Sequence, residues 1–436
     1  MSGLAKILLE EGNMISGSDP VPNQETETLS RGGAQFNITQ TADNITNDID
    51  IIVTTAAIPD TNPELVRAHE LGLTVVKRSE LLNTIINTKK SIAVTGTHGK
   101  TTTSSMLSEV LIAANKDPLV VVGAEVESIG SNSRRGEGEY SVAEVCEYQR
   151  AFLDIHPYAA IITNIDSDHL DCYRDIEDIK AAFTKFVGQI DPQGFLVYCG
   201  DDKNASEVAE KYLGKKVSYG YGNHNDIVAS NVVINETESR FTVAGLGEFT
   251  LKVPGRHNIL NALAVIAVSN DLKVEYLPIN HALAAFRGAE RRFQLLGVYQ
   301  GTPVIDDYAH HPTELTATLA AARERYPNRR IVAVFQPHQY SRTKLLLHDF
   351  VSALTAADKV IVPEIYAVRD KAEDISSVSS KDIVDLINID NPDKAVYFKT
   401  FEETIGYIKS NSETNDVVLT IGAGPIYKVG EELVES

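Results

Sequence analysis

The sequence predicts an α/β protein of three domains, each built on a mostly parallel sheet. Short apolar runs alternate with helix-compatible segments along all 436 residues, a pattern that is typical of parallel sheets. One hydrophobic core rarely extends beyond about 250–300 residues, so a chain of this length divides into several domains. A glycine loop lies between a predicted strand and a predicted helix at residues 95–103, which places a phosphate-binding unit in the middle domain.

The first predicted domain covers residues 1–88. Helix-like MSGLAKILLEEGN is followed by strand-like MISGSD and later by DIDIIVTTAAI, PELVRAHELG and LTVVKRSELLNTII. Asp19 ends the second piece, where a dinucleotide-type βαβ unit carries its acidic residue. In such a unit a strand and a glycine loop precede the first helix, and here the sequence starts at that helix. We therefore expect a Rossmann-like domain that lacks its first strand and glycine loop, with the natural start upstream. The alternative is a short domain whose first helix is rebuilt differently.

The second predicted domain, residues 89–290, contains the loop TGTHGKTTT after the apolar run SIAV. Gly96 and Gly99 allow backbone N–H groups to approach an anion, and Lys100 can reach the β- and γ-phosphates of a nucleotide. Thr101 would place its hydroxyl on Mg²⁺. The loop is shorter than the eight-residue Walker pattern, with Val94 where the first glycine would fall. A glycine turn followed by a lysine is the competing interpretation.

Two acidic clusters follow predicted strands of this domain. Glu144 comes after the run YSVA, at a strand end beside the phosphate loop, where a Mg²⁺ ligand is expected. The segment TNIDSDHLD follows the run AAII. Its polar residues, gathered in one turn, are Asn164, Asp166, Asp168, His169 and Asp171. Because Mg²⁺ prefers oxygen, a bound His169 implies a second metal position that tolerates nitrogen.

A helix is predicted to start within VPGRHNILNALA, residues 253–264. His257 and Asn261 stand four positions apart and share one face of this helix. A side-chain amide both donates and accepts, as an adenine edge requires. The third predicted domain, residues 291–436, has its own strand and helix alternation in GTPVIDDYAHHPTELTATLAAARERYP, RRIVAVFQPH, KVIVPEI and DVVLTIGAG.

Composition excludes several classes of protein. With 60 acidic and 40 basic residues the net charge is -20, which repels nucleic acid. No apolar run reaches about 18 residues, so no membrane insertion is expected, and the first residues do not resemble a secretory signal. Three cysteines without metal-ligand spacing suit a reducing compartment. We expect a cytoplasmic protein.

Eight motifs occur in a fixed order: TGTHGKTTT, EVCEYQRAFL, TNIDSDHLDCY, VPGRHNILNALA, RRFQ, DDYAHHPTE, FQPHQYSRT and GAG. Together they resemble the Mur ligase family over nearly the whole chain. The resemblance implies the three-domain architecture of that family: a Rossmann-like first domain, a central P-loop ATPase domain and a Rossmann-like last domain. MSGLAKILLEEGNMISGSD matches the first domain after its GIGGIG loop.

Carried over residue by residue, the resemblance implies four sets of site residues. The ATP-binding set is Gly96, Thr97, His98, Gly99, Lys100, Thr101, Thr102, His257, Asn261, Arg291 or Arg292, and Asp306 or Asp307. The metal ligands are Thr101, Glu144 and His169. The substrate-side residues are Asn164, Tyr308, His310, His311, His338 and Arg342. The catalytic set is Lys100, Glu144, His169, His310 and Arg342.

The activity implied is that of the family's alanine-adding branch, in peptidoglycan synthesis. ATP and Mg²⁺ or Mn²⁺ would serve a ligation of L-alanine to the lactyl carboxylate of UDP-N-acetylmuramate through an acyl phosphate. No protein nucleophile is needed, so catalysis consists of positioning and charge neutralisation. A monomer or a homodimer is expected.

Three positions depart from the family pattern. Cys146 and Gln149 stand where acidic residues are usual, and Gln339 stands where arginine is frequent. Phe183 lies near the position of a carbamylated lysine in sister ligases, and its presence agrees with the alanine-adding branch. The alternatives that stay open are a recycling ligase that attaches a tripeptide to the same sugar, a nucleotide-binding protein without catalysis, and a P-loop switch.

Overall fold

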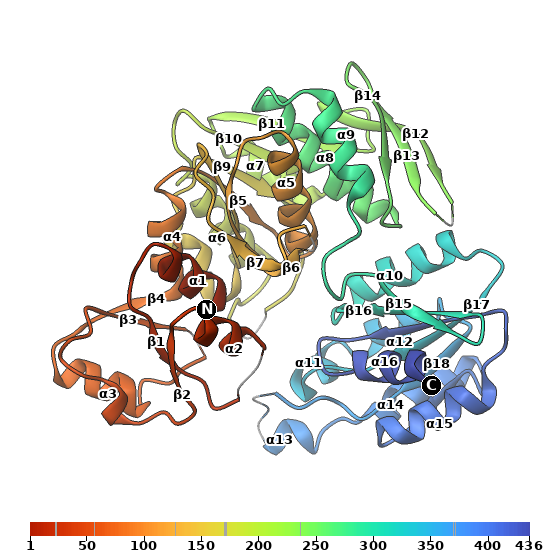
Figure 1. The fold of residues 1–436 in the computed structure, drawn as a ribbon. Helices are drawn as coiled ribbons and strands as arrows, with labels where there is room; N and C mark the ends of the chain where they lie inside the picture. Colours follow the sequence, from red (N-terminus) through yellow and green to blue (C-terminus); the bar gives the residue numbers. More distant parts are fainter. Residues whose placement is uncertain are drawn as a thin grey trace. The chain divides into compact units, whose positions relative to one another are not determined.

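The structure, a computed structural model, describes residues 1–21, 24–55, 57–126, 128–169, 172–235, 237–368, 370 and 372–436. The chain forms two compact units. The first contains residues 1–228 and 260–282, and the second contains residues 229–259 and 283–436. Figure 1 colours the chain along its sequence and labels the elements named below. Within the described residues, no helix has the length and apolar character needed to cross a membrane.

The first part of the first unit contains two small parallel sheets. The elements are α1 (Ser2–Glu10), β1 (Ser16–Ser18), α2 (Gln24–Arg31), β2 (Gln35–Asn37), the 3-10 turn η1 (Ala42–Asn44), β3 (Ile51–Thr54), α3 (Pro63–Glu70), β4 (Thr74–Lys77) and α4 (Arg78–Ile86). β1 pairs with β2, and β3 pairs with β4. Asp19 directly follows β1, as the sequence predicted, and Leu4 and Ile7 of α1 are buried in the core of this unit.

A larger sheet in the same unit carries the phosphate loop. Its strands lie in the order β11-β10-β9-β5-β8-β6-β7, and all neighbours are parallel except β6 and β7. Their bounds are β5 (Lys90–Thr95), β6 (Leu119–Val126), β7 (Ser131–Arg134), β8 (Tyr140–Glu144), β9 (Ala159–Ile162), β10 (Phe195–Cys199) and β11 (Lys215–Gly220). The runs SIAV, YSVA and AAII therefore form three adjacent strands, as their apolar character predicted. β5 lies between β8 and β9, so the ends of these strands meet at one edge.

Helical segments follow several strands of this larger sheet. They are α5 (Lys100–Ala113), the 3-10 segment η2 (Tyr148–Asp154), α6 (Ile176–Val187) and α7 (Lys203–Glu210). α5 begins directly after the glycine loop and has many buried side chains, as expected for a helix beside the central strand. Two later helices, α8 (Arg256–Asp271) and α9 (Tyr276–Ala285), follow in the chain, and α8 confirms the helix predicted to start within residues 253–264.

The second unit contains an antiparallel ribbon and a six-stranded sheet. The ribbon comprises β12 (Ile227–Ile234), β13 (Ser239–Val243) and β14 (Gly247–Leu251). The first two residues of β12, Ile227 and Val228, belong to the first unit and pair in parallel with β11. The sheet order is β15-β16-β20-β17-β18-β19, parallel except for β15 and β16. Its strands are β15 (Gln294–Tyr299), β16 (Thr302–Asp307), β17 (Arg330–Phe335), β18 (Lys359–Val362), β19 (Ala395–Tyr397) and β20 (Asp416–Ile421).

Helices cover both faces of this sheet (Figure 1). They are α10 (Pro312–Arg325), α11 (Tyr340–Leu345), α12 (Leu347–Leu354), α13 (Ala372–Ile375), α14 (Ser380–Asp390), α15 (Phe401–Asn411) and α16 (Tyr427–Glu435). Side chains of α10, α12 and α14 form one core with the sheet, and those of α15 and α16 form the other. The α/β class and the parallel sheets predicted from the sequence are confirmed.

Candidate functional site

The glycine loop joins β5 to α5 and is held by the segment that follows β9. The amide of His98 donates to Oδ1 of Asn164 at 2.9 Å, and the Thr163 hydroxyl donates to the carbonyl of His98 at 2.6 Å. Gly96 has φ 132°, and a Cβ there would overlap the Thr163 hydroxyl. Glycine is therefore required at this position by both backbone conformation and space. Thr163 was not among the predicted site residues.

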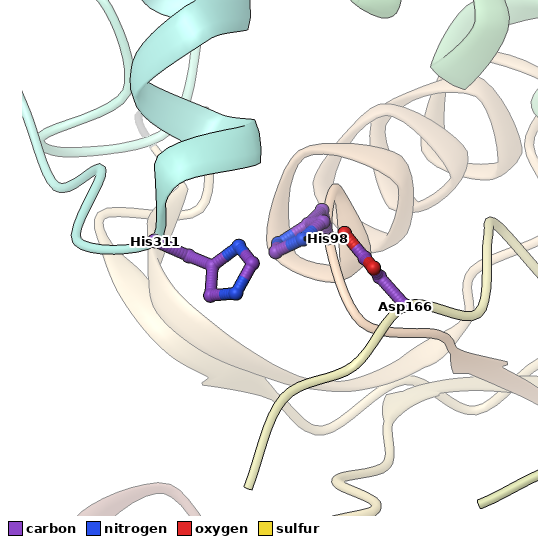
Figure 2. Close-up of side chains that lie close together, drawn as sticks. All are labelled: His98, Asp166 and His311. Carbon is purple, nitrogen blue, oxygen red and sulfur yellow. Dashed lines mark ion pairs between the residues drawn. The ribbon is translucent and has the colours of Figure 1, made fainter. Parts of the chain in front are cut away.

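Asp166 supports the same loop from a second point. Its amide donates to Oγ1 of Thr97 at 2.8 Å, and its carboxylate lies 3.6 Å from Nε2 of His98 (Figure 2). The loop residues Thr97 and His98 thus contact the TNIDSDH segment through both backbone and side chains. Asn164 and His98, predicted for substrate and ATP respectively, are in direct contact.

Gly99 caps the N-terminus of α5 with φ 80°. A Cβ at Gly99 would lie 2.6 Å from Oδ1 of Asn261, so the side-chain amide of Asn261, on α8, lies close to the phosphate loop. Thr101 and Thr102 follow in the first turn of α5, each 7% exposed, where helix N–H groups lack partners within the helix. This turn has the geometry of an anion-binding helix terminus.

The side chain of Lys100 folds back onto the glycine loop. Its Nζ donates to the carbonyls of Gly96 at 2.5 Å and Thr97 at 2.9 Å, and it lies 3.1 and 3.0 Å from the two carboxylate oxygens of Glu147. Burial disfavours the charged ammonium, but the surrounding acidic groups, Glu147 foremost and then Cys146 and Glu144, together outweigh this effect and raise the pKa of Lys100. The lysine is therefore a fixed positive charge at the position predicted for phosphate binding.

The sequence analysis named Glu144 as the acidic residue beside the phosphate loop, but the glutamate that contacts Lys100 is Glu147. It is 3% exposed, and its Oε1 lies 3.7 Å from Nε2 of His169. Glu144, at the end of β8, instead accepts from the amide of Gly123 at 3.0 Å. Among the described residues we find no hydrogen bond or ion pair between Glu144 and His169. The sequence contains both glutamates, but it did not predict the turn that brings Glu147 to Lys100.

His169 lies in a left-handed turn with φ 55°. Its ring is 5.0 Å from that of Tyr148, and its Nε2 is 3.9 Å from the carboxylate of Asp168. The structure thus brings together Lys100, Glu147 and His169. Asp171, named in the same predicted cluster, lies outside the described residues.

His257 is the second residue of α8 and belongs to the second unit. Burial, together with the nearby Arg292 charge, lowers its pKa to about 4, so its ring is neutral near pH 7. A neutral imidazole can accept as well as donate, which suits a polar aromatic edge. Asn261, four residues later, belongs to the first unit.

Arg291 and Asp306 bind each other in the second unit. Nε of Arg291 lies 2.9 Å from Oδ2 of Asp306, and the Thr420 hydroxyl donates to the other oxygen at 2.7 Å. Burial raises the pKa of Asp306, although Arg291 opposes this shift. The sequence left two alternatives for ATP binding, Arg291 or Arg292 and Asp306 or Asp307. In the structure, Arg291 and Asp306 are engaged with each other.

Asp307 anchors the segment that carries the predicted substrate residues. Its carboxylate accepts from the amides of Phe293 and Ala309, both at 2.8 Å, and from the Thr318 hydroxyl at 3.2 Å. Burial raises its pKa to about 6, although Arg292 and these amides favour the charged form. Asp307 thus ties the RRFQ segment to the DDYAHHP turn. Arg292 contacts the ring of Tyr308, with 5.2 Å to its centroid.

The predicted substrate residues of the second unit form a cluster of rings. His310 lies 5.5 Å from Tyr308 and 6.2 Å from His338, measured between centroids. Nη1 of Arg342 is 3.4 Å from Nδ1 of His338. Burial, with help from Arg342, lowers the pKa of His338 to about 4. His311 instead caps α10, since its Nδ1 accepts from the amide of Thr313 at 3.4 Å.

A cavity of about 320 Å³ lies beside Asp19 in the first unit. Thr26 and Arg31 of α2 line it together with Phe36 of β2. It combines an apolar ring with charged groups of both signs, which suits a polar small molecule with a planar part.

Three family profiles match the chain in succession. Residues 1–90 match the "Mur ligase family, catalytic domain", residues 94–269 the "Mur ligase middle domain", and residues 291–424 the "Mur ligase, glutamate ligase domain". The three-domain architecture predicted from the sequence is confirmed by these matches.

Named relatives cover the full chain. A UDP-N-acetylmuramate–L-alanine ligase of Caldanaerobacter subterraneus is 46% identical over 441 residues, 100% of this chain and 95% of the relative. That of Clostridium acetobutylicum is 43% identical, with 99% and 94% covered. The crystal structure of a UDP-N-acetylmuramate-alanine ligase from Thermotoga maritima is 32% identical, with a TM-score of 0.84 over 100% of this chain and 96% of that one. A murein peptide ligase of Psychrobacter arcticus, 22% identical with a TM-score of 0.70, shares the fold over 100% of this chain and 96% of its own. The chain belongs to the Mur ligase family.

Proposed function

We propose that this protein is the ATP-dependent ligase that joins L-alanine to UDP-N-acetylmuramate in peptidoglycan synthesis, the reaction for which its relatives are named. The observation that carries the proposal is Lys100, which is held in the glycine loop by Gly96, Thr97 and Glu147. A buried ammonium at the N-terminus of a helix is suited to the γ-phosphate of ATP.

The substrate carboxylate would attack the γ-phosphate and release ADP, forming an acyl phosphate. The amine of L-alanine would then attack the acyl carbon, and phosphate would leave. Lys100 neutralises the charge on the transferred group, and the loop amides at Gly96 to Thr102 orient it. No side chain forms a bond to the substrate in this scheme.

Mg²⁺ or Mn²⁺ is the metal that we propose. The donor set fits a divalent cation: the Thr101 hydroxyl, the imidazole of His169 and a carboxylate from Glu144 or Glu147. Of the two carboxylates, Glu147 is favoured because its Oε1 lies 3.7 Å from Nε2 of His169, whereas Glu144 accepts from the amide of Gly123. A bound ion would supply charge neutralisation at the phosphates. An imidazole ligand favours a position that accepts Mn²⁺ as well as Mg²⁺.

Roles of the remaining residues are proposed from the resemblance to the family motifs. His98, Gly99, Asn261 and His257 are proposed for the nucleotide, with Arg291 or Arg292 and Asp306 or Asp307. Arg292 is the favoured arginine, since Arg291 is engaged with Asp306. Both aspartate carboxylates are engaged within the second unit, Asp306 with Arg291 and Asp307 with the amides of Phe293 and Ala309, so both stay in the proposal. Asn164, Tyr308, His310, His311, His338 and Arg342 are proposed for the side where alanine and muramate meet.

Domain limits, cell compartment and assembly also stay proposals. We propose domains at residues 1–88, 89–290 and 291–436; the first boundary lies in the turn between α4 and β5, which supports it. The family matches lie close to the same limits. A cytoplasmic monomer or homodimer is proposed, because ATP and the UDP-sugar are cytoplasmic metabolites.

The test is phosphate release by the purified protein with ATP and Mg²⁺, with UDP-N-acetylmuramate and L-alanine added singly and together. Release that requires both supports the proposal. A second series replaces L-alanine with the tripeptide L-Ala-γ-D-Glu-meso-diaminopimelate. A preference for the tripeptide would indicate a recycling ligase, and release without either acceptor would indicate a simple nucleotide hydrolase.

A further inference from the structure

The chain makes a left-handed turn immediately after Glu147. Gln149 has φ 50° and ψ 26°, and Arg150 has φ 59° and ψ 22°. Both lie in the left-handed region, which residues with a Cβ adopt only when surrounding contacts hold them. Two such residues in succession therefore point to a specific brace.

Arg150 supplies this brace through its side chain. Its Nη2 lies 2.8 Å from both carboxylate oxygens of Asp178, in the first turn of α6. Its guanidinium lies 4.9 Å from the centre of the Tyr173 ring. Asp178 also accepts from the amide of Arg174 at 3.2 Å, so the carboxylate is fixed by backbone as well as by charge. The Arg150 bond lowers the pKa of Asp178, as expected for a charged pair.

The same ring reaches the backbone of Glu147. The hydroxyl of Tyr173, a residue only 2% exposed, donates to the Glu147 carbonyl at 2.6 Å, and the amide of Arg150 donates to that carbonyl at 2.9 Å. The backbone of Glu147 is thus held by Tyr173 and by the turn that Arg150 braces. Its carboxylate points to Lys100 and His169.

We propose that Arg150 is a positioning residue which, through Asp178 and Tyr173, keeps the Glu147 carboxylate beside the phosphate-loop lysine. This inference rests on the proposed function, since it assumes that Glu147 and Lys100 face a metal–nucleotide complex. Arg150 contacts neither Lys100 nor His169 among the interactions of the described residues, so its effect passes through the turn.

The experiment compares Arg150→Ala, Asp178→Asn and Tyr173→Phe with Lys180→Ala. Lys180 is a matched control because it stands on the same helix α6 and pairs with Glu177 at 2.6 Å and Glu207 at 2.5 Å. Each protein is titrated with ADP at saturating Mn²⁺ by calorimetry, and backbone exchange at residues 147–152 is followed by mass spectrometry. The urea midpoint of each variant monitors general loss of stability.

We expect Arg150→Ala and Asp178→Asn to weaken ADP–Mn²⁺ binding by about 10- to 100-fold, the range for groups that orient ligands. Exchange at residues 147–152 should accelerate in parallel. A double variant that combines Arg150→Ala with Asp178→Asn should bind ADP–Mn²⁺ no more weakly than either single variant, because both substitutions act through one ion pair. Tyr173→Phe, which keeps the ring under Arg150, should give a smaller effect of the same sign, and Lys180→Ala less than a twofold change.

Equal ADP affinity in Arg150→Ala and Lys180→Ala would overturn the inference, as would a loss of affinity without faster exchange at 147–152. The two proposals separate in the wild-type controls. A wild-type protein that binds ADP–Mn²⁺ but fails to ligate contradicts the proposed function alone. One that ligates normally, with Arg150→Ala equally tight for ADP, contradicts the positioning role alone.

Discussion

Nζ of Lys100 lies within 3.1 Å of both carboxylate oxygens of Glu147, although the two residues are 47 positions apart in the chain. Both side chains are largely buried, with exposed fractions of 13% for Lys100 and 4% for Glu147. The pair therefore links the start of α5 to the turn after β8, and each charge depends on the other for compensation.

Lys100→Met should lower the free energy of unfolding by about 3–5 kcal/mol, the usual cost of leaving a buried charge without its partner. Adding Glu147→Gln to the same chain should recover a large part of this loss, since no carboxylate then remains buried. Urea unfolding followed by circular dichroism measures both, as the chain contains no tryptophan. Identical midpoints for the single and double variants would argue against this dependence.

Gly96→Ala should abolish tight nucleotide binding, and Gly72→Ala provides the control. Both glycines have positive φ, 132° and 69°, but only at Gly96 would a Cβ overlap a neighbour, the Thr163 hydroxyl. Gly72 has no heavy atom within 4 Å of the added Cβ. Backbone strain alone should cost Gly72→Ala about 1–2 kcal/mol. A nucleotide titration in which both variants bind ATP equally well would contradict the role of Gly96.

The buried Asp307 should make stability depend on pH. Burial raises its pKa from the ordinary 3.8 to about 6 in the folded chain, so the folded state retains a proton between these two pH values. The stabilising contribution is complete below about pH 4 and is lost as pH rises through about 6. The difference between the two pKa values corresponds to about 3 kcal/mol in the free energy of unfolding. The free energy of unfolding of wild type minus that of Asp307→Asn should fall between pH 4 and 6.5, and a flat difference would refute the shift.

His257 and His338 should titrate near pH 4 instead of near 6.5. Burial favours their neutral rings, so the unfolded chain binds more protons than the folded one between pH 4 and 6.5. Stability contributed by these rings is present above pH 6.5 and is lost as pH falls through about 4. Nitrogen-15 chemical shifts of the imidazoles report the titration directly. Midpoints close to 6.5 would mean that both rings are open to water.

The local parts of this fold could be predicted from the sequence. The strand, loop and helix around Gly96 to Lys100 were predicted because apolar periodicity and glycine position are properties of a few adjacent residues. The helix that carries His257 and Asn261 was predicted for the same reason. The strand before Glu144 ended where expected, at the last residue of β8.

The choice between Glu144 and Glu147 could not be made in this way. It depends on a left-handed turn at Gln149 and Arg150, two residue types that carry no signal for positive φ. The turn is held by Asp178, 28 positions from Arg150, and one sequence contains no record of such a pair. The ion pair between Arg291 and Asp306 distinguishes these two residues from Arg292 and Asp307. It could not be predicted either, because it joins residues 15 positions apart in the chain.

The strand order around β5 has a kinetic consequence. β5 is paired on one side by β8 and on the other by β9, and the loop above it is fastened by contacts such as His98 to Asn164, 66 positions apart. Closing such long loops costs entropy before the contacts form, so parallel pairing of this kind develops late in folding. During refolding, helical ellipticity should therefore recover before the ability to bind ATP, and nucleotide binding would report the last steps of assembly in the first unit.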